Sequence, residues 1–155
     1  MKIYMHINYF ETHYHLEEAF DLAREIGFDG IEVRDRDRSG AMPLEDYLAL
    51  TRRLVEESGL GITYGCRVDT THPDAAVREQ SLAHFIRVIE FAGELGVTTL
   101  NAFTGPLYLK GGRHSECGSA LATQEHYDEA ARMFRQAASV AAKYGITLCL
   151  ETHNG

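Results

Sequence analysis

The chain has 155 residues, enough for one well-packed domain and short for two. Hydrophobic residues make up 45% and charged residues 25% of the chain, as in ordinary globular proteins, which argues against disorder and against a fibrous repeat. The formal net charge is −8, and basic residues are scattered apart from the run 34–38, which two aspartates interrupt, so we expect no nucleic-acid partner.

The first expected element is a strand over residues 2–8, and a repeated phrase follows it. Four segments each read as a helix end, a glycine and then a strand: 25–33, 57–64, 94–100 and 143–150. Helices commonly end at a residue in the left-handed conformation, which glycine adopts without steric cost. We therefore predict that the helices end at Gly27, Gly59, Gly96 and Gly145.

Apolar residues recur at helical spacing before each of these glycines, which predicts four amphipathic helices. Pro43 suits the first turn of the second helix, and Thr123 suits the N-cap of the fourth. Five strands that alternate with four helices predict a parallel sheet with right-handed crossovers.

The same elements in this length are also typical of a complete flavodoxin-like five-stranded α/β sheet. The faces of the strands favour a TIM-type (β/α) barrel instead. In the last strand one face carries Ile146, Leu148 and Leu150, and the other carries Thr147, Cys149, Glu151 and His153. An apolar face toward the helices and a polar face toward a shared interior are typical of a barrel.

A closed barrel of this type has eight strands and about 250 residues. We therefore expect residues 1–155 to be a single domain that forms the N-terminal portion of a (β/α)8 barrel, from the first unit to the fifth strand, with the C-terminal strands missing. Unpaired edge strands invite association. A homo-oligomer or a complementing barrel half is the partner that this incompleteness predicts.

The N-terminus has no long apolar core, and no apolar run approaches the roughly 20 residues that span a membrane. We expect a cytoplasmic protein without a membrane partner. Cys66, Cys117 and Cys149 are odd in number and widely spaced, which predicts reduced thiols rather than a disulfide framework.

Three segments resemble the xylose isomerase-like TIM barrels, a family that includes sugar epimerases, hydroxypyruvate isomerases, inosose dehydratases and apurinic endonucleases. They are 1–6, 27–34 and, above all, 145–155. The resemblance covers the whole chain. It implies a metal-dependent isomerase or epimerase that moves a proton next to a carbonyl of a small sugar or polyol.

The resemblance implies that Glu151, at the end of the fifth strand, binds a divalent metal (Mn, Mg, Co or Zn) and exchanges a proton with the substrate. Carboxylate oxygens suit such cations, and a polarised carbonyl acidifies the adjacent carbon. The alternative is a solvated side chain. Because the family's other ligands lie on strands six to eight, we expect the chain alone to be inactive and to bind metal weakly.

Four further polar residues are expected on the inner face of the barrel. His6, Asn101 and His153 are candidate substrate-binding residues, although His153 also fits an exposed chain end. Glu32 is expected to make an interior hydrogen bond or ion pair. His13, Tyr14 and His15 resemble a metal patch, but two histidines two residues apart share no helical face, which favours a solvated loop.

The segment 104–122 is long and rich in glycine, so it is a candidate lid or substrate-contact loop on the catalytic face, with disorder as the alternative. Two other functions compete with the isomerase or epimerase. A dehydratase of a polyhydroxy ketone would use the same scaffold, and a half-barrel is also compatible with a non-catalytic binding or assembly module. An apurinic endonuclease is disfavoured by the acidic charge and by Asn101 in place of a histidine.

Overall fold

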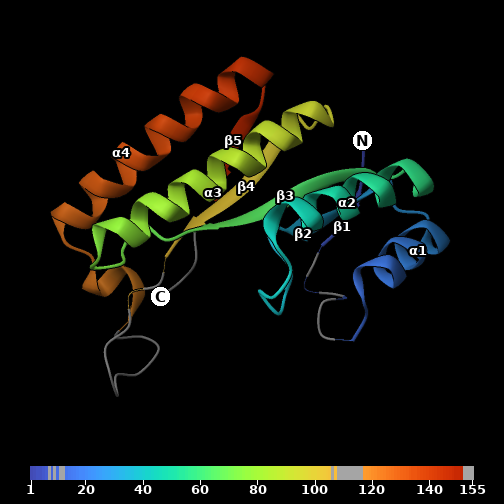
Figure 1. Ribbon diagram of the computed structural model, residues 1–155, viewed down its shortest axis with the longest axis horizontal. Coiled ribbons are helices and arrows are strands. Elements are labelled where there is room, and N and C mark those ends of the chain that lie inside the picture. The colour runs from blue at the N-terminus through green and yellow to red at the C-terminus, as the bar shows by residue number, and fades with distance from the viewer. Residues whose placement is uncertain (7, 9, 11–12, 106, 108–116, 152–155) are drawn as a thin grey trace.

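The computed structural model describes residues 1–151 except 7, 9, 11–12, 106 and 108–116 (Figure 1). Its strands and helices alternate along the chain. They are β1 (Tyr4–Met5), α1 (Leu16–Ile26), β2 (Gly30–Arg34), α2 (Leu44–Ser58), β3 (Gly61–Val68), α3 (Ala75–Glu94), β4 (Thr99–Thr104), the 3-10 helix η3 (Gly118–Leu121), α4 (Gln124–Ala141), the 3-10 helix η4 (Ala142–Tyr144) and β5 (Thr147–Leu150). The strand β1 is shorter than predicted.

All five strands are parallel, and each pairs with the next one along the chain, in the order β1-β2-β3-β4-β5. A flavodoxin-like sheet has the order 2-1-3-4-5, so that alternative is wrong. Because successive right-handed crossovers all advance in one direction, the helices lie on one face of the sheet. In Figure 1, α3 and α4 run side by side at one end and α1 and α2 at the other. The arrangement is a partial (β/α) barrel.

The helix ends confirm most of the local predictions. Gly27, Gly59 and Gly145 have φ values of 92°, 73° and 68°, and each caps a helix in the left-handed conformation. Thr123 is the N-cap of α4, where its hydroxyl accepts a hydrogen bond from a backbone N–H. Pro43 was expected inside the first turn of α2 but precedes it, because its backbone is extended (ψ 144°).

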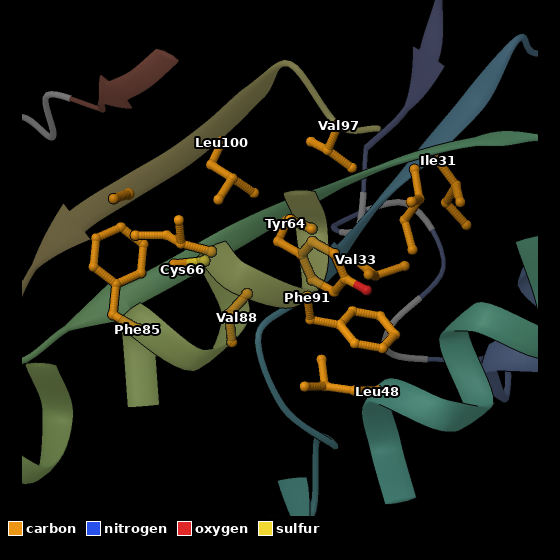
Figure 2. Packing of buried hydrophobic residues seen from close by; sticks show 14 of the residues in the cluster. Ile31, Val33, Leu48, Tyr64, Cys66, Phe85, Val88, Phe91, Val97 and Leu100 are labelled. Atoms are coloured by element: carbon orange, nitrogen blue, oxygen red, sulfur yellow. The ribbon is translucent and has the colours of Figure 1, made fainter. Parts of the chain in front are cut away.

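The hydrophobic core fills the space between the helices and the sheet face that they cover. Figure 2 shows Leu48 of α2 and Phe91 of α3 packed toward Tyr64 of β3. Tyr64 is fully buried, and its hydroxyl lies 2.9 Å from the hydroxyl of Thr51. Thr51 in turn donates to the carbonyl of Leu48. The Tyr64 hydroxyl, the one polar group of this large side chain, therefore has a hydrogen-bond partner inside the core.

The helices α3 and α4 are joined by ion pairs on the outside and by apolar contact within. Glu129 of α4 accepts hydrogen bonds from Arg78 of α3 and from Arg132, and these two arginines lower the pKa of Glu129 to about 2. The rings of Phe85 and Phe134 meet edge to face. The three cysteines are free, as predicted. None of the described helices is long and apolar enough to cross a membrane.

Candidate functional site

The face of the sheet that the helices leave uncovered is lined by polar side chains and glycines. The strand register places Glu32 beside Thr63, and places Gly65 beside Asn101. Asn101 in turn lies beside Cys149 of β5. We call this the inner face, because it corresponds to the interior of a closed barrel. It carries the polar residues that the alternation predicts.

Glu32 is the centre of a polar group on the inner face. Its carboxylate accepts a hydrogen bond from the amide of Asn101 at 2.7 Å, and it lies 3.0 Å from Nε2 of His6. Only 9% of the Glu32 side chain is exposed, so its charge needs these partners. The hydrogen bond predicted for Glu32 is thereby confirmed. The structure brings His6 and Asn101 together on one carboxylate.

Gly65 allows Glu32 to reach Asn101 across an intervening strand. Glu32 lies on β2 and Asn101 on β4, and on the intervening β3 Gly65 pairs with Asn101 while the preceding inward residue, Thr63, pairs with Glu32, so the contact runs diagonally past Gly65. A Cβ atom at Gly65 would lie 3.1 Å from Oε1 of Glu32, a tight contact. The missing side chain therefore leaves the path of the carboxylate clear.

The Tyr4 ring covers the N-terminal end of the inner face, where glycines again make room for a side chain. A Cβ added to Gly30 or to Gly61 would overlap this ring. Two glycines on neighbouring strands thus let one aromatic side chain lie flat across β2 and β3. The ring closes the N-terminal end of the inner face, so the C-terminal strand ends are the accessible end.

Glu151 directly follows β5 at this accessible end. Its backbone N–H donates to the carbonyl of Ala102 at 2.9 Å, which extends the pairing with β4 one residue beyond Leu150. The alternation therefore continues, and Glu151 shares the face of Cys149. The residue is exposed and takes part in an interaction within the protein. His153 lies outside the described residues.

The described part of the chain contains no group of three or more His, Cys, Asp or Glu side chains that could hold a metal ion. Glu151 therefore offers one carboxylate at a strand end and not a complete coordination sphere. Sites for divalent metals on such scaffolds need several ligands. The described residues alone do not fit a metal centre.

A pocket of about 640 Å³ lies between the segments that follow β1 and β2. Its lining includes the arginines of the run 34–38 and the patch His13–His15; the full set is Phe10, His13, Tyr14, His15, Leu16, Arg34, Arg36, Asp37, Arg38, Ser39 and Tyr47. The patch is exposed, as a loop should be, but it forms one wall of this pocket. The clustering of basic residues at 34–38 was the sequence signal for it, and the interrupting aspartates obscured that signal.

Asp35 holds Arg36, one of these arginines, through two hydrogen bonds. Its carboxylate is almost fully buried and accepts hydrogen bonds from Nε and Nη2 of Arg36 at 3.1 and 2.7 Å. Nε2 of His84, on α3, lies 3.3 Å from the same carboxylate. Burial raises the pKa of Asp35, but His84 and Arg36 outweigh it, so that this pKa lies below its usual value. Sequence patterns gave no sign of this cluster, because His84 is 49 residues away.

The predicted lid is only partly described, since residues 106 and 108–116 lie outside the described residues. Cys117 is buried, and the N–H of Gly118 donates to the carbonyl of Leu107 at 2.7 Å. This bond joins the two described ends of the segment. Whether the segment acts as a lid stays a prediction.

Comparison with known proteins gives one family and many similar structures. The model of the xylose isomerase-like TIM barrel family matches residues 20–155. None of the curated proteins matches the chain.

Among solved structures, D-psicose 3-epimerase from Clostridium cellulolyticum H10, crystallised with D-tagatose, has a TM-score of 0.72 and 16% identity; the match covers 98% of this chain and 52% of that one. D-allulose 3-epimerase from Methylomonas sp., in complex with D-allulose, has a TM-score of 0.71 and 20% identity over 99% and 52% of the two chains. The IOLI protein with a bound zinc atom has a TM-score of 0.65 and 17% identity over 97% and 51%. The chain thus spans about half the length of these similar proteins.

Proposed function

Because the chain belongs to the xylose isomerase-like TIM barrel family, we propose that it supplies the N-terminal half of a metal-dependent isomerase or epimerase for a small sugar or polyol. The proposal rests mainly on Glu151, a carboxylate that follows β5 and shares the inner face with the polar group around Glu32. Several proteins with similar structures are sugar 3-epimerases, which supports the substrate class.

In this proposal Glu151 is the base. Its carboxylate takes the proton from the carbon next to the substrate carbonyl, and the electron pair of that C–H bond moves toward the carbonyl oxygen to give an enediolate. An acid from outside the described residues then gives a proton to the other face of the same carbon, which restores the carbonyl, yields the epimer and leaves the first proton on Glu151. For an isomer, Glu151 returns its proton to the former carbonyl carbon, and the proton of the neighbouring hydroxyl moves to the former carbonyl oxygen, so that the carbonyl changes place.

His6 and Asn101 are the proposed substrate-binding residues on the described inner face, together with His153. Both described residues already contact Glu32. An amide and an imidazole held on a buried carboxylate keep further donors and acceptors for sugar hydroxyls. Glu32 would act as a positioning residue, since it orients both side chains without reaching the substrate itself.

We also propose that Glu151 is one ligand of a divalent metal and that the remaining ligands come from outside the described residues. The zinc atom in the IOLI protein supports metal binding in this fold. With Glu151 as the one proposed ligand among the described residues, the chain should bind Mn²⁺ weakly and should not turn over a ketose by itself. Calorimetry that finds tight stoichiometric Mn²⁺ binding to the isolated chain would contradict this part of the proposal.

The catalytic role can be tested in a complete barrel made by supplying strands six to eight of a related protein, fused or in trans. Deuterium incorporation next to the carbonyl of D-allulose in D₂O with Mn²⁺ reports the proton transfer by NMR. Glu151→Gln should lower the exchange rate by about 10²–10⁴-fold. The matched control is Glu56→Gln, an exposed carboxylate on α2 that should leave the rate unchanged. Equal rates in the wild type and Glu151→Gln would remove Glu151 from the mechanism.

A second candidate function is a non-catalytic assembly module, and exposed apolar side chains at both edges of the sheet favour it. Ile3, before β1, and Leu150, in β5, are 54% and 57% exposed, and both belong to the face that the helices cover elsewhere. Analytical ultracentrifugation separates the two candidates. A stable dimer without proton exchange in the completed barrel would support the module, and a monomer that gains exchange on completion would support the enzyme.

A further inference from the structure

The C-terminal ends of β3, β4 and β5 place three inner-face residues in one row. Arg67 of β3 pairs with Phe103 of β4. The N–H of Glu151 donates to the carbonyl of Ala102, which in a parallel ladder sets Glu151 beside Phe103. Figure 1 shows the three strands side by side. The row therefore runs from Arg67 through Phe103 to Glu151, across the accessible end of the inner face.

Strand alternation directs these side chains to the inner face. On β3, Cys66 and Val68 are buried on the helix side, and Arg67 between them is exposed. On β4, Phe103 is half-buried and lies two residues beyond Asn101, on the same face. Arg67 and Phe103 thus belong to the same open surface as the proposed base.

The guanidinium of Arg67 is available to a ligand. Within the described part of the chain it makes no hydrogen bond or ion pair, although the carbonyl of Arg67 accepts a hydrogen bond from Nη2 of Arg36. By contrast, five arginines on the helices each pair with a carboxylate: Arg52, Arg53, Arg78, Arg87 and Arg132. A guanidinium offers five N–H donors, and those of Arg67 face the open surface.

The length of the row matches the length of a sugar. Neighbouring strands lie about 4.8 Å apart, so the backbones of Arg67 and Glu151, separated by β4, are about 9.6 Å apart. An extended six-carbon sugar has five C–C bonds of about 1.5 Å and spans about 6 Å, and hydrogen bonds at its two ends fill the remainder. A three-carbon ketone spans only about 2.5 Å, so one that is held at Glu151 does not reach Arg67.

Phe103 gives the middle of the row an apolar surface. Sites for small molecules combine such a surface with a few polar groups that fix the orientation of the ligand. The C–H groups of a sugar chain can lie against Phe103 while its hydroxyls reach the polar ends of the row. The ring of Tyr4 covers the other end of the inner face and leaves this end open.

We propose that Arg67 is a specificity-determining residue that donates hydrogen bonds to hydroxyls at the end of the sugar remote from Glu151. It thereby selects sugars of five or six carbons over three-carbon ketones. The inference rests on the proposed function, because Glu151 defines where the reacting carbon lies. Neutral hydroxyls are sufficient acceptors for a guanidinium, so the selection requires no charge on the substrate.

Kinetics in the completed barrel test this selection. D-allulose and dihydroxyacetone both carry a proton next to a carbonyl, and NMR measures deuterium incorporation into each in D₂O with Mn²⁺. Arg67→Met keeps an unbranched apolar side chain but removes the donors. The preference for D-allulose over dihydroxyacetone, as a ratio of kcat/KM values, should fall about tenfold, mainly through a higher KM for D-allulose. Arg67→Lys keeps one donating group and should recover part of the preference.

The matched control is Arg53→Met on α2. Arg53 is an exposed arginine that pairs with Glu17 and Glu57 on the helix side of the sheet, so its removal should leave the preference as in the wild type. An unchanged preference in Arg67→Met would overturn the proposal. An equal fall in kcat for both substrates would also overturn it, because that result indicates a general disturbance of the site.

A binding measurement on the 155-residue chain separates this inference from the proposed function. D-allulose should shift the Nε–H NMR signal of Arg67, and dihydroxyacetone at the same concentration should shift it less, while the signal of Arg53 stays in place. A shift at Arg67 without proton exchange in the completed barrel would refute Glu151 as the base and retain Arg67 as a sugar contact. Proton exchange on D-allulose without a shift at Arg67 would refute the role of Arg67 and retain the enzyme.

Discussion

The two faces of β3 differ strongly in burial. On the outer face, toward the helices, Ile62, Tyr64, Cys66 and Val68 are all buried. On the inner face, Thr63 and Gly65 are half-buried and Arg67 is exposed. The same eight residues therefore serve a tightly packed layer on one side and an open polar surface on the other.

The difference shows which interactions give stability and which prepare a site. The outer face is held by apolar burial, which is non-directional and tolerates similar side chains. The inner face is held by a few specific contacts among Glu32, His6 and Asn101, each of which needs a defined geometry. We therefore expect substitutions on the outer face to change stability most, and those on the inner face to change the site more than the fold.

The largest effect is expected from Phe85→Ala in the layer between α3 and the sheet. Phe85 is 1% exposed and meets the ring of Phe134 at a centroid distance of 6.1 Å. Its removal leaves a cavity and should lower the free energy of unfolding by about 3–5 kcal/mol, measured by urea denaturation. Tyr127→Ala, on the exposed surface of α4, is the control and should change it by less than about 0.5 kcal/mol. Similar losses in both variants would mean that the layer between α3 and the sheet is not the main source of stability.

The second-largest effect on stability is expected from Asp35→Asn, because Asp35 is a charged residue on the side of the sheet that the helices cover. Asp35→Asn removes a carboxylate that Arg36 and His84 contact, and should cost about 2–3 kcal/mol at pH 7. The pKa of Asp35 is lowered in the folded protein, so its contribution is fully present above the unfolded pKa of about 3.9 and is lost as the pH falls through the folded pKa. The stability difference between wild type and variant should therefore shrink below about pH 4. A difference that stays constant from pH 7 to pH 3 would contradict the lowered pKa.

On the inner face, Glu32→Ala should cost about 1–2 kcal/mol, because it leaves the amide of Asn101 and the ring of His6 without their shared acceptor. Glu32→Gln is the conservative variant. It keeps an oxygen acceptor for Asn101 and should cost less than the alanine variant. Urea denaturation gives the cost, and NMR shifts of the Asn101 side-chain amide report whether the contact persists. An unchanged amide signal in Glu32→Ala would show that the contact does not form in solution.

The sequence predicted the architecture well because the determinants of the architecture are local. Glycine at a helix end, the alternation of polar and apolar residues in β5 and the apolar spacing before Gly27 each act within a few residues. The inward direction of Glu32 followed from the same alternation. The strand faces then favoured the barrel over the flavodoxin-like sheet, and the observed strand order decides between the two.

The site was predicted only in part, because its contacts join distant segments. The contact between Glu32 and Asn101 spans 69 residues and depends on the absence of a side chain at Gly65, which no local pattern marks. The pocket likewise joins the patch His13–His15, which was predicted to be a solvated loop, to Arg34 and Arg36 of a distant segment. Long-range contacts of this kind follow from the strand register, and the register follows from the fold.

The smallest and most specific effect is expected from Gly65→Ala. The backbone of Gly65 does not have a positive φ, so alanine is compatible with it, and a methyl group usually favours a strand over glycine. Against this, the new Cβ would lie 3.1 Å from the Glu32 carboxylate and would push it off the path to Asn101. The two effects oppose each other, so the free energy of unfolding should change by less than about 1 kcal/mol while the Asn101 amide signal shifts as in Glu32→Ala. Gly61→Ala is the matched comparison, since its Cβ would instead meet the ring of Tyr4 and should leave that amide signal unchanged. If Gly65→Ala leaves the Asn101 amide where it is in the wild type, the carboxylate does not cross β3 at this glycine, and the inner face is held together in some other way.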